Sequence, residues 1–79
     1  MRKSYSSEEK EFLKKVGKRI REIRHDAKLS QEQLAFKCDL DRTYIGSVER
    51  GERNISILNI RKISSALTIT ISELFNLEK

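Results

Sequence analysis

Residues 29–54 read LSQEQLAFKCDLDRTYIGSVERGERN, and this stretch contains two short helix patterns, each opened by a capping residue. The Ser30 hydroxyl can accept a hydrogen bond from a backbone N–H in the first turn, and Gln33 can reach back to the Ser30 amide as a capping box. Asp41 places a carboxylate at the positive end of the second helix dipole. The stretch therefore predicts a helix, a tight turn and a second helix over residues 30–50.

The side chains of this motif divide into an inward set and an outward set. Ala35 supplies the small contact that a steep helix crossing needs, and Leu40 supplies an apolar plug in the turn. Ile45 and Val48 share the inward face of the second helix. The residues left outward there are mostly polar or basic, the types that contact base edges and phosphates: Arg42, Thr43, Tyr44, Gly46, Ser47 and Arg50. The second helix is therefore predicted to read DNA.

Seven residues of the stretch fit the pattern S-Q-x-x-L-A followed by x-x-x-I-x-x-x-E-x-G: Ser30, Gln31, Leu34, Ala35, Ile45, Glu49 and Gly51. This pattern resembles the helix–turn–helix of the phage-repressor-like (lambda repressor/Cro, XRE-type) family. With Arg24 upstream and the apolar pattern downstream, the resemblance covers roughly residues 16–75. Within that family, the block LDRTYIGSVERGERNIS is most similar to the controller proteins of restriction–modification systems.

Length and composition agree with a small helical domain. The chain has 79 residues and no proline, and it shows no internal repeat or low-complexity segment. The resemblance implies an all-α fold, a five-helix lambda-repressor-like DNA-binding domain that contains the helix–turn–helix. We expect residues 1–79 to form one domain with a flexible arm (1–6), the helix–turn–helix (30–50) and a dimerisation region (55–79).

A long first helix is predicted before the motif. Ser6 or Ser7 can cap it, and Ser6 with Glu9 forms a second capping box. Its inward stripe is spaced three and four residues apart: Phe12 or Leu13, Val16, Ile20, Ile23 and Ala27.

Two shorter helices are predicted after the motif. Gly51 is expected to end the second helix of the motif in a left-handed conformation, and Ser56 can cap a fourth helix. Ser72 is expected to cap a short fifth helix that contains Leu74 and Phe75.

Charge and cysteine content narrow the function. A formal charge of +5 and a pI near 9.6 indicate an anionic partner such as a phosphate backbone. Cys38 is the single cysteine, which excludes an internal disulfide, provides no pair of metal ligands and suits a reducing cytoplasm. We expect Cys38 to be a small buried hydrophobe and His25, near the end of the first helix, to have a cap-like or surface role. No signal peptide, membrane span, metal site, cofactor site or catalytic constellation is visible, so we do not expect an enzyme.

Charged and apolar residues are unevenly distributed along the chain. Residues 1–54 contain fourteen of the seventeen basic residues, whereas residues 55–79 contain twelve apolar residues and five charged ones. This apolar content exceeds what one small core needs, so part of it is expected in a two-fold dimer interface, drawn from these residues: Ile57, Leu58, Ile69, Ile71, Leu74, Phe75 and Leu77. The alternative is that all of them serve the core of one chain.

Four residues of the second motif helix are candidates for reading bases. Arg42 is the first, because arginine makes bidentate contacts with guanine O6 and N7. Thr43 can contact a thymine methyl or a phosphate, and Ser47 lies one turn later on the same face. Tyr44 either packs in the core or uses its hydroxyl on DNA; similarity to controller proteins implies the DNA role.

The family resemblance also assigns two supporting roles. Arg24 and Glu49 match positions where a partly buried ion pair ties the first helix to the recognition helix. Gln31 matches the phosphate clamp at the start of the first motif helix, and its alternative role is a supporting cap.

The end of the recognition helix and the loop after it are expected to bind phosphates. Arg50, Arg53 and Asn54 lie there, and the alternative for these exposed groups is a solubilising role. Gly46 costs about 1 kcal/mol relative to alanine inside a helix, which suggests close approach of another backbone or of DNA.

Three functions are compatible with these features. The leading one is a homodimeric transcriptional regulator on a palindromic operator of double-stranded DNA; as a controller protein it activates its own promoter at low occupancy and represses it at high occupancy. The second is a prophage-type repressor or an antitoxin of the same fold. The third is a protein-interaction module without DNA binding. Activation would add RNA polymerase as a partner, with Glu32 or Glu49 as acidic contact candidates, and we expect control by protein concentration rather than by a small molecule.

Overall fold

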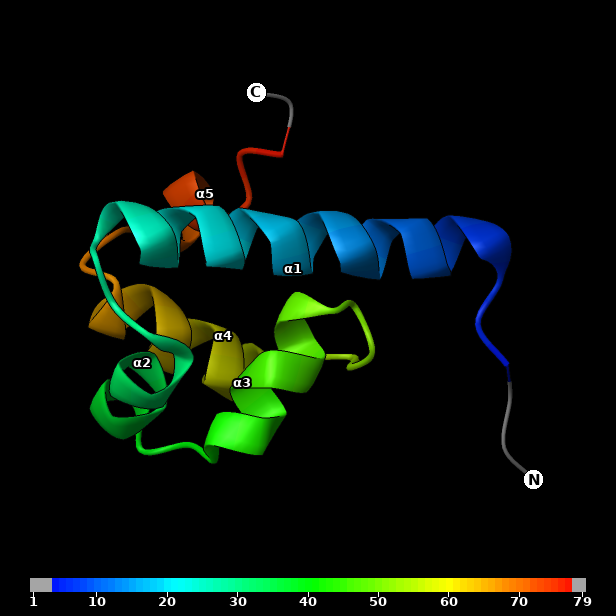
Figure 1. The fold of residues 1–79 in the computed structure, drawn as a ribbon. Coiled ribbons are helices and arrows are strands. Elements are labelled where there is room, and N and C mark those ends of the chain that lie inside the picture. The colour runs from blue at the N-terminus through cyan, green and yellow to red at the C-terminus, as the bar shows by residue number, and fades with distance from the viewer. Residues whose placement is uncertain (1–3, 78–79) are drawn as a thin grey trace.

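The computed structural model describes residues 4–77, which form five α-helices joined by short loops (Figure 1). The helices are α1 (Ser7–Asp26), α2 (Gln31–Cys38), α3 (Arg42–Glu49), α4 (Ile57–Ala66) and α5 (Ile71–Leu74). Over these residues there is no strand, and the expected all-α, five-helix fold is confirmed. Residues 1–3 of the expected arm and residues 78–79 of the expected dimerisation region lie outside the described residues.

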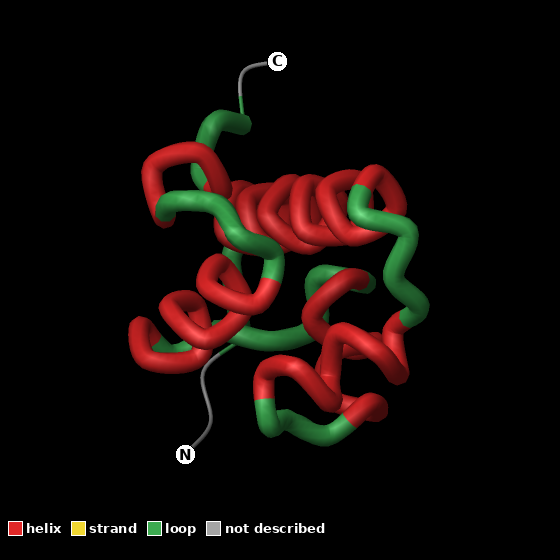
Figure 2. Tube along the Cα trace, turned by 90° about the vertical axis from the view of Figure 1, so that its left-hand side faces the viewer, coloured by secondary structure: helices red, strands yellow, loops and turns green. Residues whose placement is uncertain are grey.

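The long α1 lies across the other helices. In Figure 1, α2, α3 and α4 lie on one side of α1, and α5 lies close to its C-terminal half. Figure 2 shows the same arrangement from a second direction, with α2, α3 and α4 below the long helix α1 and the short α5 beside it. The N-terminal part of α1 extends past α2 and α4, and the loop between α3 and α4 lies near it.

Capping residues set the helix starts, as the sequence predicted for four of the five helices. Ser6 Oγ accepts from the Glu9 N–H at 3.1 Å, and Ser30 Oγ accepts from the Gln33 N–H at 3.0 Å. Both are complete capping boxes. Asp41 caps α3 because its carboxylate accepts from the Thr43 N–H, and Ser56 caps α4 because its hydroxyl accepts from the Asn59 N–H.

The predicted cap of the fifth helix is wrong. Thr70, not Ser72, caps α5, and it forms a capping box in which the Glu73 N–H donates to Thr70 Oγ1 at 3.0 Å and Glu73 Oε1 accepts from the Thr70 N–H at 2.8 Å. The Thr–x–x–Glu pattern at residues 70–73 is the sequence signature of this capping box.

The core collects the inward stripes of all five helices: Val16, Ile20, Leu34, Ala35, Cys38, Ile45, Val48, Ile60, Ile63, Leu67 and Leu74. On α1 the choice between two neighbours is resolved, because Leu13 is half-buried whereas Phe12 is 53% exposed. Ala27 is exposed because it is the C-cap residue, where α1 has ended. Burial raises the pKa of the Cys38 thiol to about 11, although the positive charge of Lys62 acts to lower it. This buried thiol therefore stays neutral at physiological pH.

The residues expected at a dimer interface separate into three groups. Leu74 is fully buried in the core of its own chain, so its assignment to an interface is wrong. Partly buried residues pack against that core: Ile69, Phe75 and Leu77. Exposed ones remain on α4 and α5: Ile57 (71%), Leu58 (64%) and Ile71 (38%). Only this last group offers an apolar surface to a partner.

Gly17 allows α1 and α3 to approach each other closely. A Cβ built on this residue would lie 2.6 Å from the Glu49 carbonyl oxygen, and it would also overlap the Val48 carbonyl oxygen. Backbone atoms cannot give way as a flexible side chain can.

After the C-terminal end of α3, Gly51 has φ +78°. This is the left-handed helix stop that the sequence predicted.

We expect Gly17→Ala to destabilise the fold by about 2 kcal/mol, since the added methyl group must push α3 away from α1. Urea denaturation followed by circular dichroism measures this. Gly46→Ala is the matched control, because a Cβ there would meet no backbone but first the far end of the Arg50 side chain, with Nη1 at 3.3 Å. The control should be neutral, or more stable by up to about 1 kcal/mol, through better helix propensity. Equal losses in both variants would show that the α1–α3 approach is not the cause.

Candidate nucleic-acid interface

The first turn of α3 is the part of this helix that remains accessible. Arg42 and Thr43 are exposed directly after the Asp41 cap, whose carboxylate accepts from the Thr43 N–H at 3.1 Å. Ile45 and Val48 on the opposite side of the helix are fully buried. The helix therefore holds two candidate base-reading side chains at its free end while its other end is fixed in the core.

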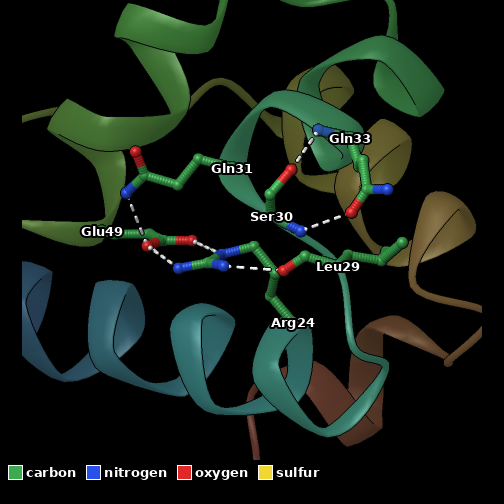
Figure 3. A network of polar contacts seen from close by, with 6 residues as sticks. All are labelled: Arg24, Leu29, Ser30, Gln31, Gln33 and Glu49. Carbon is green, nitrogen blue, oxygen red and sulfur yellow. Dashed lines mark hydrogen bonds and ion pairs between the residues drawn. The ribbon is translucent and has the colours of Figure 1, made fainter.

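Three helices are joined by a buried polar network around the Glu49 carboxylate (Figure 3). Arg24 Nε donates to Glu49 Oε2 at 2.7 Å, and Arg24 Nη2 donates to Glu49 Oε1 at 3.0 Å. Arg24 Nη1 also donates to the Leu29 carbonyl at 2.8 Å. The two charged side chains are 7% and 3% exposed. Because removal of one partner would leave a buried charge unpaired, at a cost of about 3 to 5 kcal/mol, this pair fixes α3 against α1.

Gln31 belongs to the same network. Its Nε2 donates to Glu49 Oε1 at 3.0 Å, so the first residue of α2 is tied to the end of α3. The side chain of Gln31 also lies over Gly46, with its Oε1 3.5 Å from the position of a Cβ on that glycine. Within the described chain the nearest neighbours of Gly46 are therefore side chains and not another backbone, and the alternative, close approach of DNA, stays a prediction. The phosphate-clamp role of Gln31 stays a prediction.

Ser47 does not face outward as the helical spacing predicted. It is 5% exposed. Its hydroxyl donates to the Tyr44 carbonyl at 2.7 Å and accepts from Arg53 Nε at 3.0 Å. The expected outward face is covered because the loop after α3 folds back over it and brings Arg53 onto Ser47. The Ser47 hydroxyl is therefore occupied by protein groups and is not presented to a base, as the helical spacing predicted it would be.

Tyr44 is half-buried and takes part in two contacts. The Arg53 guanidinium carbon lies 5.3 Å from the centre of its ring, within the range of a cation–π contact. Its hydroxyl accepts from Asn59 Nδ2 at 3.1 Å. Asn59 is a residue that sequence reasoning missed. Asn59 lies in the first turn of α4, where a polar side chain commonly forms a hydrogen bond with the backbone of its own helix. Its position in the sequence therefore did not indicate a contact with α3.

The basic end of α3 and the following loop remain exposed at Arg50, Arg53 and Asn54. Arg50 Nε forms an ion pair with Glu52 Oε2 at 3.0 Å. The hydrogen bond and the opposite charge lower the pKa of Glu52 and raise the pKa of Arg50, so the pair stays ionised at neutral pH. Glu52 therefore competes with any phosphate for Arg50, and sequence reasoning did not foresee this competition.

Comparison with known proteins places these features in context. The sequence pattern of the helix–turn–helix family matches residues 20–74. Control protein C.MunI of Mycoplasma sp is 48% identical over 63 residues, which cover 78% of this chain and 85% of that protein. Control protein C.BamHI of Bacillus amyloliquefaciens is 51% identical over 61 residues, which cover 76% of this chain and 75% of that protein.

A solved structure shows the same similarity. The crystal structure of the restriction–modification controller protein C.AhdI from Aeromonas hydrophila superimposes with a TM-score of 0.79 at 56% identity. The match covers 80% of this chain and 96% of that chain. No described helix has the length and apolar character needed to cross a membrane.

Proposed function

The chain belongs to the helix–turn–helix family of DNA-binding transcription regulators, and from this premise we propose that it is a controller of a restriction–modification system that binds a palindromic operator at its own promoter as a homodimer. The observation that carries the proposal is the free first turn of α3. It presents Arg42 and Thr43 to solvent on a helix that the Arg24–Glu49 pair holds rigidly in place.

In this proposal α3 enters the major groove with its N-terminal turn. Arg42 reads a base edge, for which the planar guanidinium suits guanine O6 and N7. Thr43 lies beside it and contacts a thymine methyl or a phosphate. The N-terminus of α2 faces the sugar–phosphate backbone of the DNA, where Gln31 and the free N–H groups of the helix end bind a phosphate. Arg50, Arg53 and Asn54 add further backbone contacts.

The proposed dimer uses the apolar residues that the core does not take up. Ile57 and Leu58 lie exposed in the first turn of α4, and Ile71 lies exposed at the start of α5. Because α4 and α5 contact each other, these residues can form one surface for a two-fold related copy. A two-fold dimer would place two α3 helices in successive major grooves, about 34 Å apart.

Whether the chain activates or represses its promoter depends, in this proposal, on how many dimers occupy the operator. We propose activation when one dimer is bound and repression when a second dimer follows. Activation needs a contact with RNA polymerase, and only one of the two acidic candidates is free for it. Glu32 is exposed on α2, whereas the Glu49 side chain is buried and bound to Arg24.

We expect wild-type protein to protect a palindrome in the DNA upstream of its own gene, in two steps as protein is titrated. Mobility shift and DNase footprinting with excess nonspecific competitor measure this. Arg42→Ala should weaken the specific complex by about 5- to 150-fold, the range for loss of one bidentate base contact. Arg21→Ala, on the exposed side of α1, removes the same charge and should have an effect of about twofold or less. If neither this DNA nor a random duplex library gave a specific complex, the chain would be a protein-interaction module instead.

We expect Leu58→Asp to shift the protein from dimer to monomer, because a carboxylate would be desolvated at the centre of the proposed surface. Sedimentation velocity over a concentration series measures the change, and circular dichroism should show an intact fold since Leu58 is 64% exposed. Phe36→Asp is the matched control: Phe36 is 87% exposed on α2, outside the proposed surface. A dimer that survives Leu58→Asp, or dissociates equally with Phe36→Asp, would contradict this interface.

A further inference from the structure

We propose that Ser47 is a positioning residue for DNA recognition: its hydroxyl holds the Arg53 guanidinium over the Tyr44 ring, so that the two terminal nitrogens of Arg53 are presented to DNA acceptor oxygens and nitrogens. The inference rests on the proposed function, because it assumes that this face of the chain binds DNA. It assigns Ser47 a part in recognition although its side chain touches no ligand.

The Ser47 hydroxyl is oriented by its own helix. It donates its single proton to the Tyr44 carbonyl at 2.7 Å, three residues earlier in α3. Because a hydroxyl has one donor and two acceptor lone pairs, this bond directs the lone pairs away from the carbonyl. Arg53 Nε donates to them at 3.0 Å. With Ser47 only 5% exposed, water has little access to replace this contact.

A second contact fixes the plane of the Arg53 guanidinium. The guanidinium carbon lies 5.3 Å from the centre of the Tyr44 ring. The ring is itself held from the side of α4, since the Tyr44 hydroxyl accepts from Asn59 Nδ2 at 3.1 Å. Arg53 belongs to a loop, where an arginine would otherwise sample many rotamers. Two contacts from α3 therefore give a loop side chain a defined position.

The atoms left over on Arg53 suit a nucleic-acid acceptor. Within residues 4–77, Nε is the one Arg53 nitrogen that has a hydrogen-bond partner in the protein, so Nη1 and Nη2 remain for a ligand. These two nitrogens form a planar pair of donors that matches a phosphate or the O6 and N7 of guanine. Because the side chain is already ordered, less rotamer freedom is lost when DNA binds.

The test is a double-mutant cycle on the operator recovered by footprinting. Ser47→Ala should weaken the specific complex by about 3- to 10-fold, the size of a modest pairwise coupling. In an Arg53→Ala background, Ser47→Ala should have no further effect, because the residue that it positions is gone. Independent, multiplying effects of the two changes would overturn the proposal.

Ser64→Ala is the matched control for the loss of a buried hydroxyl. Ser64 is buried on α4, and its Oγ donates to the Arg61 carbonyl three residues earlier at 3.1 Å, but it accepts from no side chain of the described residues. This variant should lose about as much stability as Ser47→Ala and keep its affinity for DNA. Equal weakening of DNA binding by both changes would assign Ser47 a merely structural role.

Salt dependence separates the two acceptors for Arg53. If Arg53 binds a phosphate, both Arg53→Ala and Ser47→Ala should weaken all duplexes and reduce the slope of log K against log salt, by about one unit for Arg53→Ala. If Arg53 binds guanine, both variants should relax discrimination at one base pair. In either case the two variants must change the same property; different properties would refute positioning. Failure of the wild-type protein to bind any operator would instead reject the proposed function itself.

Discussion

The close crossing of α1 and α3 is the constraint on which the rest of the structure depends. Gly17 brings the backbone of α1 against the last carbonyl groups of α3, and about two turns further along α1 Arg24 binds Glu49 at the end of the same helix. The first contact needs the absence of a side chain, and the second needs a paired buried charge. Together they fix one end of α3 in position and orientation, and Gln31 adds α2 to the same junction.

Fixing α3 at its C-terminal end divides the helix into a held part and a presented part. Its first turn projects away from the junction with two exposed polar side chains, while its last turns are buried. The loop that follows returns over α3, so Arg53 lies beside Tyr44 although the two residues are nine positions apart in sequence. The proposed recognition of DNA combines residues from the fixed helix α3 with one loop residue, Arg53, whose side chain contacts α3.

The sequence predicted the parts of this fold that depend on local chemistry. Capping residues and helical periodicity located the helices because both signals act within a few residues. Contacts between segments that are distant in sequence were harder to predict. The spacing of α3 assigned Ser47 to the outer face, but it could not show that a loop covers this face. Apolar content likewise identified a surplus after residue 55 without separating Leu74, which the core takes up, from Leu58, which it leaves exposed.

The most direct test of the account is a chemical-shift titration of the ¹⁵N-labelled chain with its operator duplex. Presentation of α3 to DNA predicts that the largest shifts occur at the amides of Arg42 and Thr43, at the N-terminus of α2 and in the loop after α3, with small shifts in α5. Large shifts confined to α4 and α5, with the first turn of α3 unchanged, would contradict it.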